Sequence, residues 1–97
     1  MTHYVAIIED AGPDNAIGVW FPDLPGCFSG GDTLEEAIRN AADAIGLYAE
    51  AHAREARTLP APRALSVLKR DAEFTADIRG NMIALISARD LMPSAAE

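Results

Sequence analysis

The sequence predicts an α+β domain in which one long helix packs on an antiparallel sheet of three to four strands, in the order β-β-β-α-(α)-β. Short runs rich in β-branched and aromatic residues, separated by turn residues, fill the first thirty positions. A run of apolar residues with helical spacing follows. With 97 residues, the chain has room for one modest hydrophobic core.

Four segments are predicted strands: residues 4–8, 17–21, 27–30 and 82–86. The first three are joined by connections too short for a parallel crossover, so an antiparallel meander is expected. The turn at residues 11–15 holds glycine and proline, and Pro22 and Pro25 make a rigid loop before the third strand. The last run is continuously apolar, which predicts a buried strand.

The long helix is expected to begin near Asp32 and to end near Arg57, before Pro60. Either Asp32 with Glu35 or Thr33 with Glu36 forms a capping box at its start. Its inward stripe is predicted from the spacing of Leu34, Ile38, Ala41, Ile45, Tyr48 and His52. A short second helix over residues 64–70 would pack through Leu65 and Leu68. We expect a domain over residues 1–90 and a poorly ordered tail, 91–97.

Charge excludes several functions. The net charge is −7, and residues 1–50 hold nine acids and one base (1 − 9 = −8). This balance argues against a general nucleic-acid binder and against a polybasic membrane anchor. No apolar run approaches the ~20 residues that cross a bilayer. The acidic half is either ordinary solvated surface or a face that docks a basic partner.

Candidate catalytic groups are sparse. Cys27 is the single cysteine, and without a neighbouring base it is expected to be a small buried side chain rather than a nucleophile. His3 and His52 are general-base candidates, although packing explains His52 equally well. A magnesium-dependent nuclease site would need acids to converge from Glu9, Asp10, Asp23, Asp32 and Glu36. Turn and capping roles explain those acids, so we expect no metal and no cofactor.

The segment from Val19 to Ala37, continuing to Asn40, resembles the signature of the HicB-like antitoxins, in which a strand ends in F-P-D-L-P-G-C and a G-D-T-x-E-E-A helix start follows. The positions that carry this resemblance are Phe21, Pro22, Pro25, Gly26, Cys27, Phe28, Gly30, Asp32, Thr33, Glu36, Ala37 and Asn40.

The resemblance implies a partial ribonuclease-H-like fold and an antitoxin whose partner is a HicA-like toxin, a small basic mRNA-cleaving ribonuclease. The expected contacts are the acids Asp10, Asp14 and Asp23 with the apolar anchors Trp20 and Leu24. Full-length relatives usually add a C-terminal DNA-binding module. No helix pair follows Ile86, so none is expected in this chain, and neither is direct nucleic-acid binding.

Three hypotheses follow: an antitoxin that occludes its toxin, a metal-dependent nuclease, and an oligomeric scaffold without a toxin partner. A reducing cytoplasm fits the single cysteine. A homo-oligomer is expected through an edge strand or through the corner at Trp20, since small sheets leave edges that are commonly covered.

Overall fold

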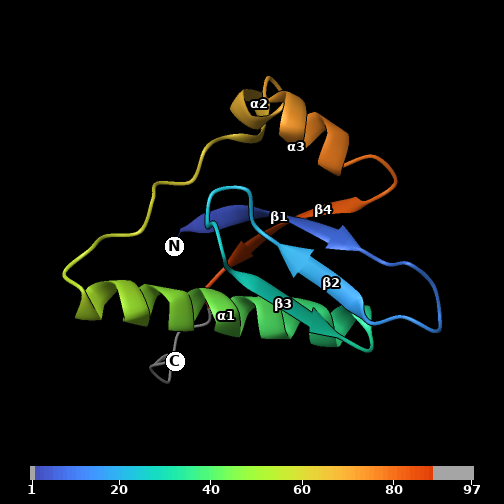
Figure 1. Ribbon diagram of the computed structural model, residues 1–97, viewed down its shortest axis with the longest axis horizontal. Coiled ribbons are helices and arrows are strands. Elements are labelled where there is room, and N and C mark those ends of the chain that lie inside the picture. Colours follow the sequence, from blue (N-terminus) through green and yellow to red (C-terminus); the bar gives the residue numbers. More distant parts are fainter. Residues whose placement is uncertain (1, 89–97) are drawn as a thin grey trace.

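A computed structural model describes residues 2–88 and shows three layers (Figure 1). Their elements are β1 (His3–Glu9), β2 (Ile17–Trp20), β3 (Phe28–Gly31), α1 (Leu34–Arg54), α2 (Leu65–Leu68), α3 (Ala72–Asp77) and β4 (Met82–Ser87). A four-stranded antiparallel sheet in the order β3-β2-β1-β4 forms the middle layer. The α1 helix packs on one face, and α2 with α3 packs on the other. The predicted α+β class, with a four-stranded antiparallel sheet and one long helix, is confirmed.

Strand register decides which side chains face each helical layer. Ile83, Ile7, Trp20 and Phe28 are paired in succession across β4, β1, β2 and β3. Directly opposed residues in antiparallel strands share a face. These four side chains therefore form one apolar row, the cross-sheet row, on the face covered by α2 and α3.

The larger core lies between the sheet and α1. Tyr4, Ala6 and Ile8 of β1 alternate toward this side, as the period of two in a strand requires. The helix meets them through Ala37, Ala41, Ala42, Ile45 and Gly46, which are its buried residues. Small side chains on this stripe let the helix lie close to the sheet.

The smaller core joins α2 and α3 to the opposite face. Leu68 and Phe74 bury against Val5 and Ile7. Asp71 caps α3, because its Oδ1 accepts from the backbone N–H groups of Glu73 (2.9 Å) and Phe74 (3.4 Å). The α3 helix was not predicted, although an aspartate cap followed by an acid in the first turn is a typical helix start.

The capping box of α1 uses Thr33 and Glu36. Thr33 Oγ1 accepts from Glu36 N at 3.1 Å, and Glu36 Oε1 accepts from Asp32 N at 2.7 Å. Asn40 donates to the carbonyl of Gly30 at 2.9 Å, which ties α1 to β3. The motif residues around the helix start are thus explained by local structure.

Several expectations were wrong in detail. Leu34 is exposed because it is the first residue of α1, and the helix ends at Arg54 rather than Arg57. Leu65 is also exposed, whereas Leu68 is fully buried. The strand β4 was expected to be buried, but three of its six residues are exposed and only Ile86 is buried, because it is the edge strand and α2 and α3 cover β1 instead. The predicted tail, 91–97, lies outside the described residues.

Gly31 is required by the close approach of β3 to α1. A Cβ atom added there would lie 2.7 Å from the backbone nitrogen of Ala37 and 3.0 Å from the carbonyl carbon of Glu36. Backbone atoms of a capped helix turn cannot move aside cheaply. By contrast, a Cβ atom added to Gly18, on the neighbouring strand β2, would have no neighbouring atom within 4 Å and would lie in open space.

We predict that Gly31→Ala lowers the free energy of unfolding by about 1–3 kcal/mol, as overpacking against backbone does. Urea denaturation followed by circular dichroism measures this loss. Gly18→Ala is the matched control and is expected to change stability by less than about 1 kcal/mol. Equal effects of the two substitutions would show that the contact at Ala37 is not limiting.

Candidate partner-binding surface

An open groove lies where the β2–β3 corner meets α3. We call it the aromatic groove, and it has a volume of about 380 Å³. It is lined by Trp20, Phe21, Pro22, Leu24, Pro25, Gly26, Cys27, Phe28, Arg63, Asp71, Glu73, Phe74 and Asp77. Much of the sequence motif therefore forms one wall, and the cap and exposed side of α3 form the other.

The floor of the aromatic groove is aromatic. Trp20 and Phe28 are directly paired on adjacent strands, and Phe74 of α3 lies beside them in the lining. Trp20 is half-buried, but Phe28 is 71% exposed. An aromatic ring this exposed contributes little to the core, so its surface is free for a partner.

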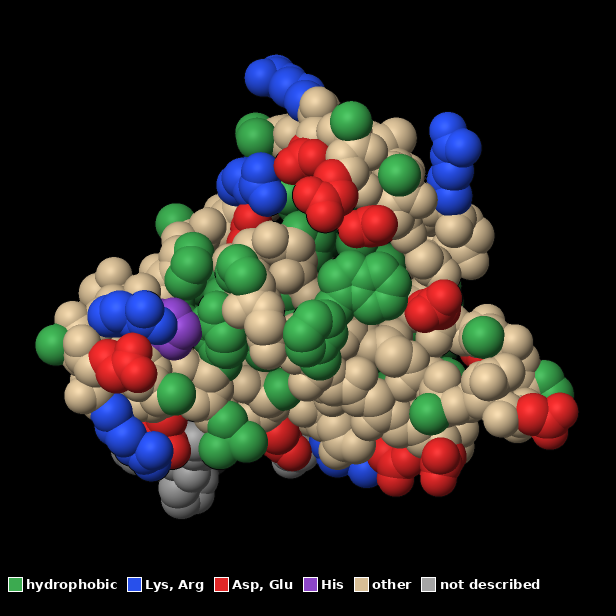
Figure 2. Space-filling view, in the orientation of Figure 1, with side chains coloured by type: hydrophobic (Ala, Val, Ile, Leu, Met, Phe, Trp, Pro, Cys, Tyr) green, Lys and Arg blue, Asp and Glu red, His purple; other side chains and the backbone are tan. Residues whose placement is uncertain are grey.

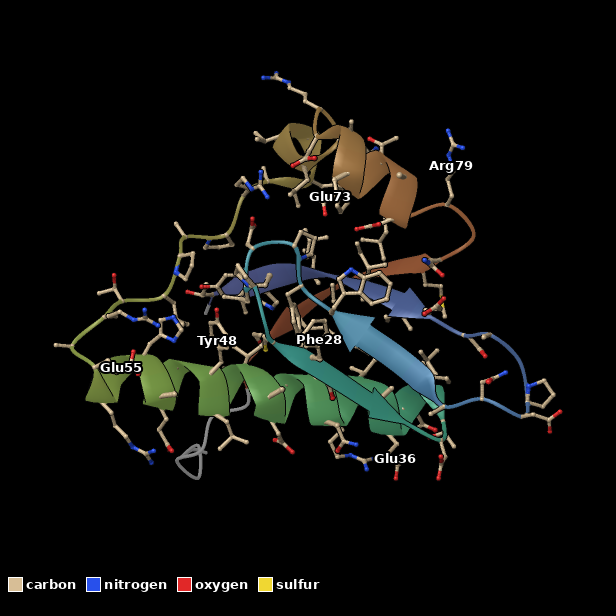
Figure 3. All side chains as sticks on the ribbon, viewed as in Figure 1. Phe28, Glu36, Tyr48, Glu55, Glu73 and Arg79 are labelled. Atoms are coloured by element: carbon tan, nitrogen blue, oxygen red, sulfur yellow. The ribbon has the colours of Figure 1, made fainter. Side chains whose placement is uncertain are left out.

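The α3 side of the aromatic groove is acidic. Glu73 and Asp77 are four residues apart and so lie on the same side of the helix. Figure 2 shows acidic side chains gathered on this side, next to the hydrophobic side chains of the sheet. Figure 3 shows Glu73 on the α3 side and Phe28 on the β3 side. Like charges at this spacing repel, and a cation placed between them would relieve the repulsion.

An ion pair between a buried aspartate and a partly exposed arginine holds the two walls together. Asp23, whose side chain is 6% exposed, accepts from the Arg63 backbone N–H at 2.7 Å and from Arg63 Nε at 2.6 Å. Arg63 Nη1 also lies 3.8 Å from Asp71 Oδ2, at the cap of α3. The motif aspartate is thus joined through one arginine to the α3 wall.

Two tyrosines fix the chain around the corner. Tyr48 of α1 donates to the carbonyl of Pro25, and Tyr4 of β1 donates to that of Pro60, both at 2.7 Å. The pKa of Tyr4 is raised mainly by burial, and then by the nearby charge of Asp23 and by Tyr48. These bonds hold the motif loop against α1 and the segment before α2 against the sheet.

The predicted contact residues do not all come together. Trp20 lines the aromatic groove as an accessible aromatic, whereas Leu24 is 0% exposed and packs in the core, so it presents no surface to a partner. The carboxylate of Asp23 is buried and paired with Arg63, so it is not available to pair with a basic residue of a partner. Asp10 and Asp14 are exposed in the β1–β2 loop, away from the aromatic groove, and Asp10 Oδ1 accepts from Gly12 N.

The structure also places the candidate catalytic groups. Cys27 is buried, as predicted, and burial raises the pKa of its thiol. His52 stacks on Tyr48 with ring centroids 4.4 Å apart, which gives it a packing role. Within residues 2–88, no three histidine, cysteine or acidic side chains lie close enough together to hold a metal ion. The five acids of the nuclease hypothesis therefore do not converge.

Phe28, Glu73, Phe74 and Asp77 were missed as site residues. Phe28 was assigned only to the motif, and the other three lie on the unpredicted helix. Their signal is present in the sequence, since Phe74 and Ile78 repeat at a helical interval and Glu73 and Asp77 repeat beside them. Only the fold shows that this helix lies over Trp20.

Residues 4–94 match the model of a family described as HicB_like antitoxin of bacterial toxin-antitoxin system. The chain belongs to this family. The HicB-like family is one of antitoxins rather than enzymes, and the resemblance drawn from residues 19–41 is confirmed. Within residues 2–88, no helix has the length and apolarity needed to span a bilayer.

Known relatives are consistent with this assignment. An uncharacterized 14.9 kDa protein of Haemophilus phage HP1 is 42% identical over 57 residues, which are 59% of this chain but only 41% of that protein. The crystal structure of the Burkholderia pseudomallei antitoxin HicB is 26% identical, with a TM-score of 0.74 over all of this chain and 68% of that one. A chain of the HicA3 and HicB3 toxin–antitoxin complex has the same fold, with a TM-score of 0.70, 23% identity and coverage of 92% and 100%.

We predict that Arg63→Ala lowers the free energy of unfolding by about 1–3 kcal/mol, because the buried carboxylate of Asp23 loses its charged partner and keeps only the backbone N–H of residue 63. The control is Arg54→Ala, which removes an exposed pair with Glu50 and is expected to cost less than about 1 kcal/mol. Denaturant titration of both variants measures the difference. A similar loss in both would contradict a special role for the Asp23–Arg63 pair.

We also predict that stability falls above about pH 8. The native pKa values of Cys27 and Tyr4 are raised, so the unfolded chain releases these protons at lower pH than the native chain does. The stabilisation is complete below the unfolded pKa and is lost as pH rises through the native pKa. Cys27→Ala is expected to flatten the first part of this decline in denaturation curves from pH 7 to 10. An unchanged slope would contradict the assignment to Cys27.

Proposed function

We propose that the chain neutralises a small, basic, HicA-like mRNA-cleaving ribonuclease by binding it and occluding its active site. The observation that carries the proposal is the family match over residues 4–94. Further support comes from the fold shared with a chain of the HicA3 and HicB3 complex. The net charge of −7 favours a basic partner, because charge complementarity speeds encounter and suppresses wrong pairings.

The aromatic groove is the contact surface that we assign to the toxin. An arginine or lysine side chain placed over Trp20 and Phe28 would gain a cation–π contact, and Glu73 and Asp77 would supply the opposite charge. Arg63 also lines the groove, but its Nε is bound to Asp23 at 2.6 Å and its Nη1 lies 3.8 Å from Asp71, so its charge is directed at those two acids. Aromatic anchors rimmed by charge are typical of interface hot spots.

The acids Asp10 and Asp14 would speed the approach of the basic toxin rather than contact it in the aromatic groove. They are exposed in the β1–β2 loop, and their charge adds to the field that attracts a basic protein. Asp23 contributes by holding Arg63, and Trp20 contributes by direct contact. Leu24 supports the groove from within the core.

The remaining properties fit the same role. We propose a cytoplasmic antitoxin of partial ribonuclease-H-like fold that acts on protein rather than directly on nucleic acid, and that forms a homo-oligomer. The free, buried Cys27 suits a reducing compartment. A toxin that cleaves mRNA works in that same compartment.

Co-expression with any small basic protein encoded by an adjacent gene tests the function. We expect a stable complex on size-exclusion chromatography and loss of RNA cleavage by that protein. Phe28→Ala is expected to weaken the complex by about tenfold or more, and Glu73→Gln by several-fold, in calorimetric titration. A toxin that stays active and unbound beside the folded chain would overturn the proposal.

Matched controls isolate the aromatic groove. Leu47 is 64% exposed on α1, so Leu47→Ala removes a similarly exposed apolar side chain. Glu35 lies in the first turn of α1 as Glu73 does in α3, so Glu35→Gln removes an equivalent charge. Both controls are expected to bind as the unsubstituted chain does. If they weaken binding as much as the groove variants, the contact surface lies elsewhere.

A further inference from the structure

A second apolar surface lies at the opposite edge of the sheet from the aromatic groove. Large hydrophobic side chains are exposed there on β4 and α2: Leu85 (66%), Met82 (44%), Ile83 (38%) and Leu65 (36%). We call these four residues the β4 edge surface. An open groove of about 560 Å³ runs between β4 and the segment entering α2. Patches of this kind on a small domain mark interaction sites.

Within residues 2–88, the backbone of β4 has no strand on its outer side. In the order β3-β2-β1-β4, β4 is the last strand, and its partner among the described strands is β1. Edge strands are normally protected by charged residues or proline, yet the stretch 82–88 contains neither. Its unpaired N–H and C=O groups therefore suit one kind of occupant, another extended strand.

Charge indicates which strand binds there. Neither β4 nor the lining of its groove contains an acid, and the groove includes Arg63. Among the residues that the structure describes, a basic toxin would find no opposite charge in this strand or its groove. Two copies of a chain with a net charge of −7 repel over most of their surfaces, but the uncharged strand β4 lets them approach.

We propose that β4 pairs with β4 of a second copy in antiparallel register, which joins two sheets into one of eight strands. The interface is isologous, as in most homodimers. The proposal specifies the surface of the homo-oligomer in the proposed function and does not depend on toxin binding.

The pattern of exposed residues selects the register. In an antiparallel pair, directly opposed residues have their side chains on the same face of the sheet, and side chains alternate between faces along each strand. Two copies of β4 related by a two-fold axis meet both conditions only if the axis passes through a residue of β4 rather than between two residues. An axis at Ala84 sets Ile83 opposite Leu85 of the second copy and Leu85 opposite Ile83. These two side chains share the α2 side of the sheet. The two most exposed side chains on that side of β4 are then buried together.

The dimer leaves the toxin surface free. The aromatic groove is built on β2 and β3, at the far edge of the sheet from β4. Each copy therefore presents its own groove, and we expect an assembly of two antitoxins with two toxins.

The test is sedimentation equilibrium of the purified chain and of Leu85→Lys. We expect a dimer whose dissociation constant rises by about tenfold or more in the variant, because lysine on an edge strand blocks strand addition. Leu47→Lys is the matched control, since Leu47 is similarly exposed and the charge changes equally. A monomer at all concentrations, or equal weakening by both variants, would overturn the proposal.

Disulfide cross-linking tests the register separately. With the axis at Ala84, Ala84→Cys places two thiols within disulfide range, and mild oxidation is expected to give a covalent dimer. Leu47→Cys is expected to remain mostly monomeric. Equal cross-linking of both would indicate random collision and would count against the pairing. A Leu85→Lys chain that still binds the toxin would show that the two surfaces are independent.

Discussion

The ion pair between Asp23 and Arg63 connects the parts of the molecule that matter for function. It joins the rigid corner between β2 and β3 to the chain entering α2, and through Asp71 to the cap of α3. Without it, the acidic helix would be held to the sheet chiefly by Leu68 and Phe74. The Asp23 carboxylate is buried and accepts two hydrogen bonds from Arg63, so its charge stabilises the fold and is not presented to a partner. Exposed carboxylates remain to meet a partner.

The cross-sheet row explains why the molecule has two apolar surfaces. Ile83, Ile7, Trp20 and Phe28 run across all four strands on one face. The short helices α2 and α3 cover the middle of this row, where Ile7 is fully buried, but they do not reach its ends. Phe28 is left at one end, beside acids, and Ile83 at the other, where β4 has no charge. The charge around each end underlies our proposals that the first contacts a basic protein and the second another copy of the chain.

The distribution of charge gives the acidic first half a more specific meaning. Asp32, Glu35 and Glu36 serve the start of α1, and Asp23 is internal. The acids best placed beside exposed aromatic rings, Glu73 and Asp77, come from the second half of the chain, whose net charge is close to neutral. Net charge by segment is therefore compatible with the basic partner that we propose, but it does not indicate which residues would contact that partner.

The sequence alone determined the family, the long helix, the strand segments and the buried cysteine, because these depend on local spacing and on one long contiguous motif. It did not determine which side chains remain exposed. Leu24 and Phe28 are four residues apart in the same motif, yet one is fully buried and the other is 71% exposed. Apolar residues of β4 look like core residues until the strand order places them at an edge. Exposure depends on which layer covers which strand, and only the tertiary structure decides that.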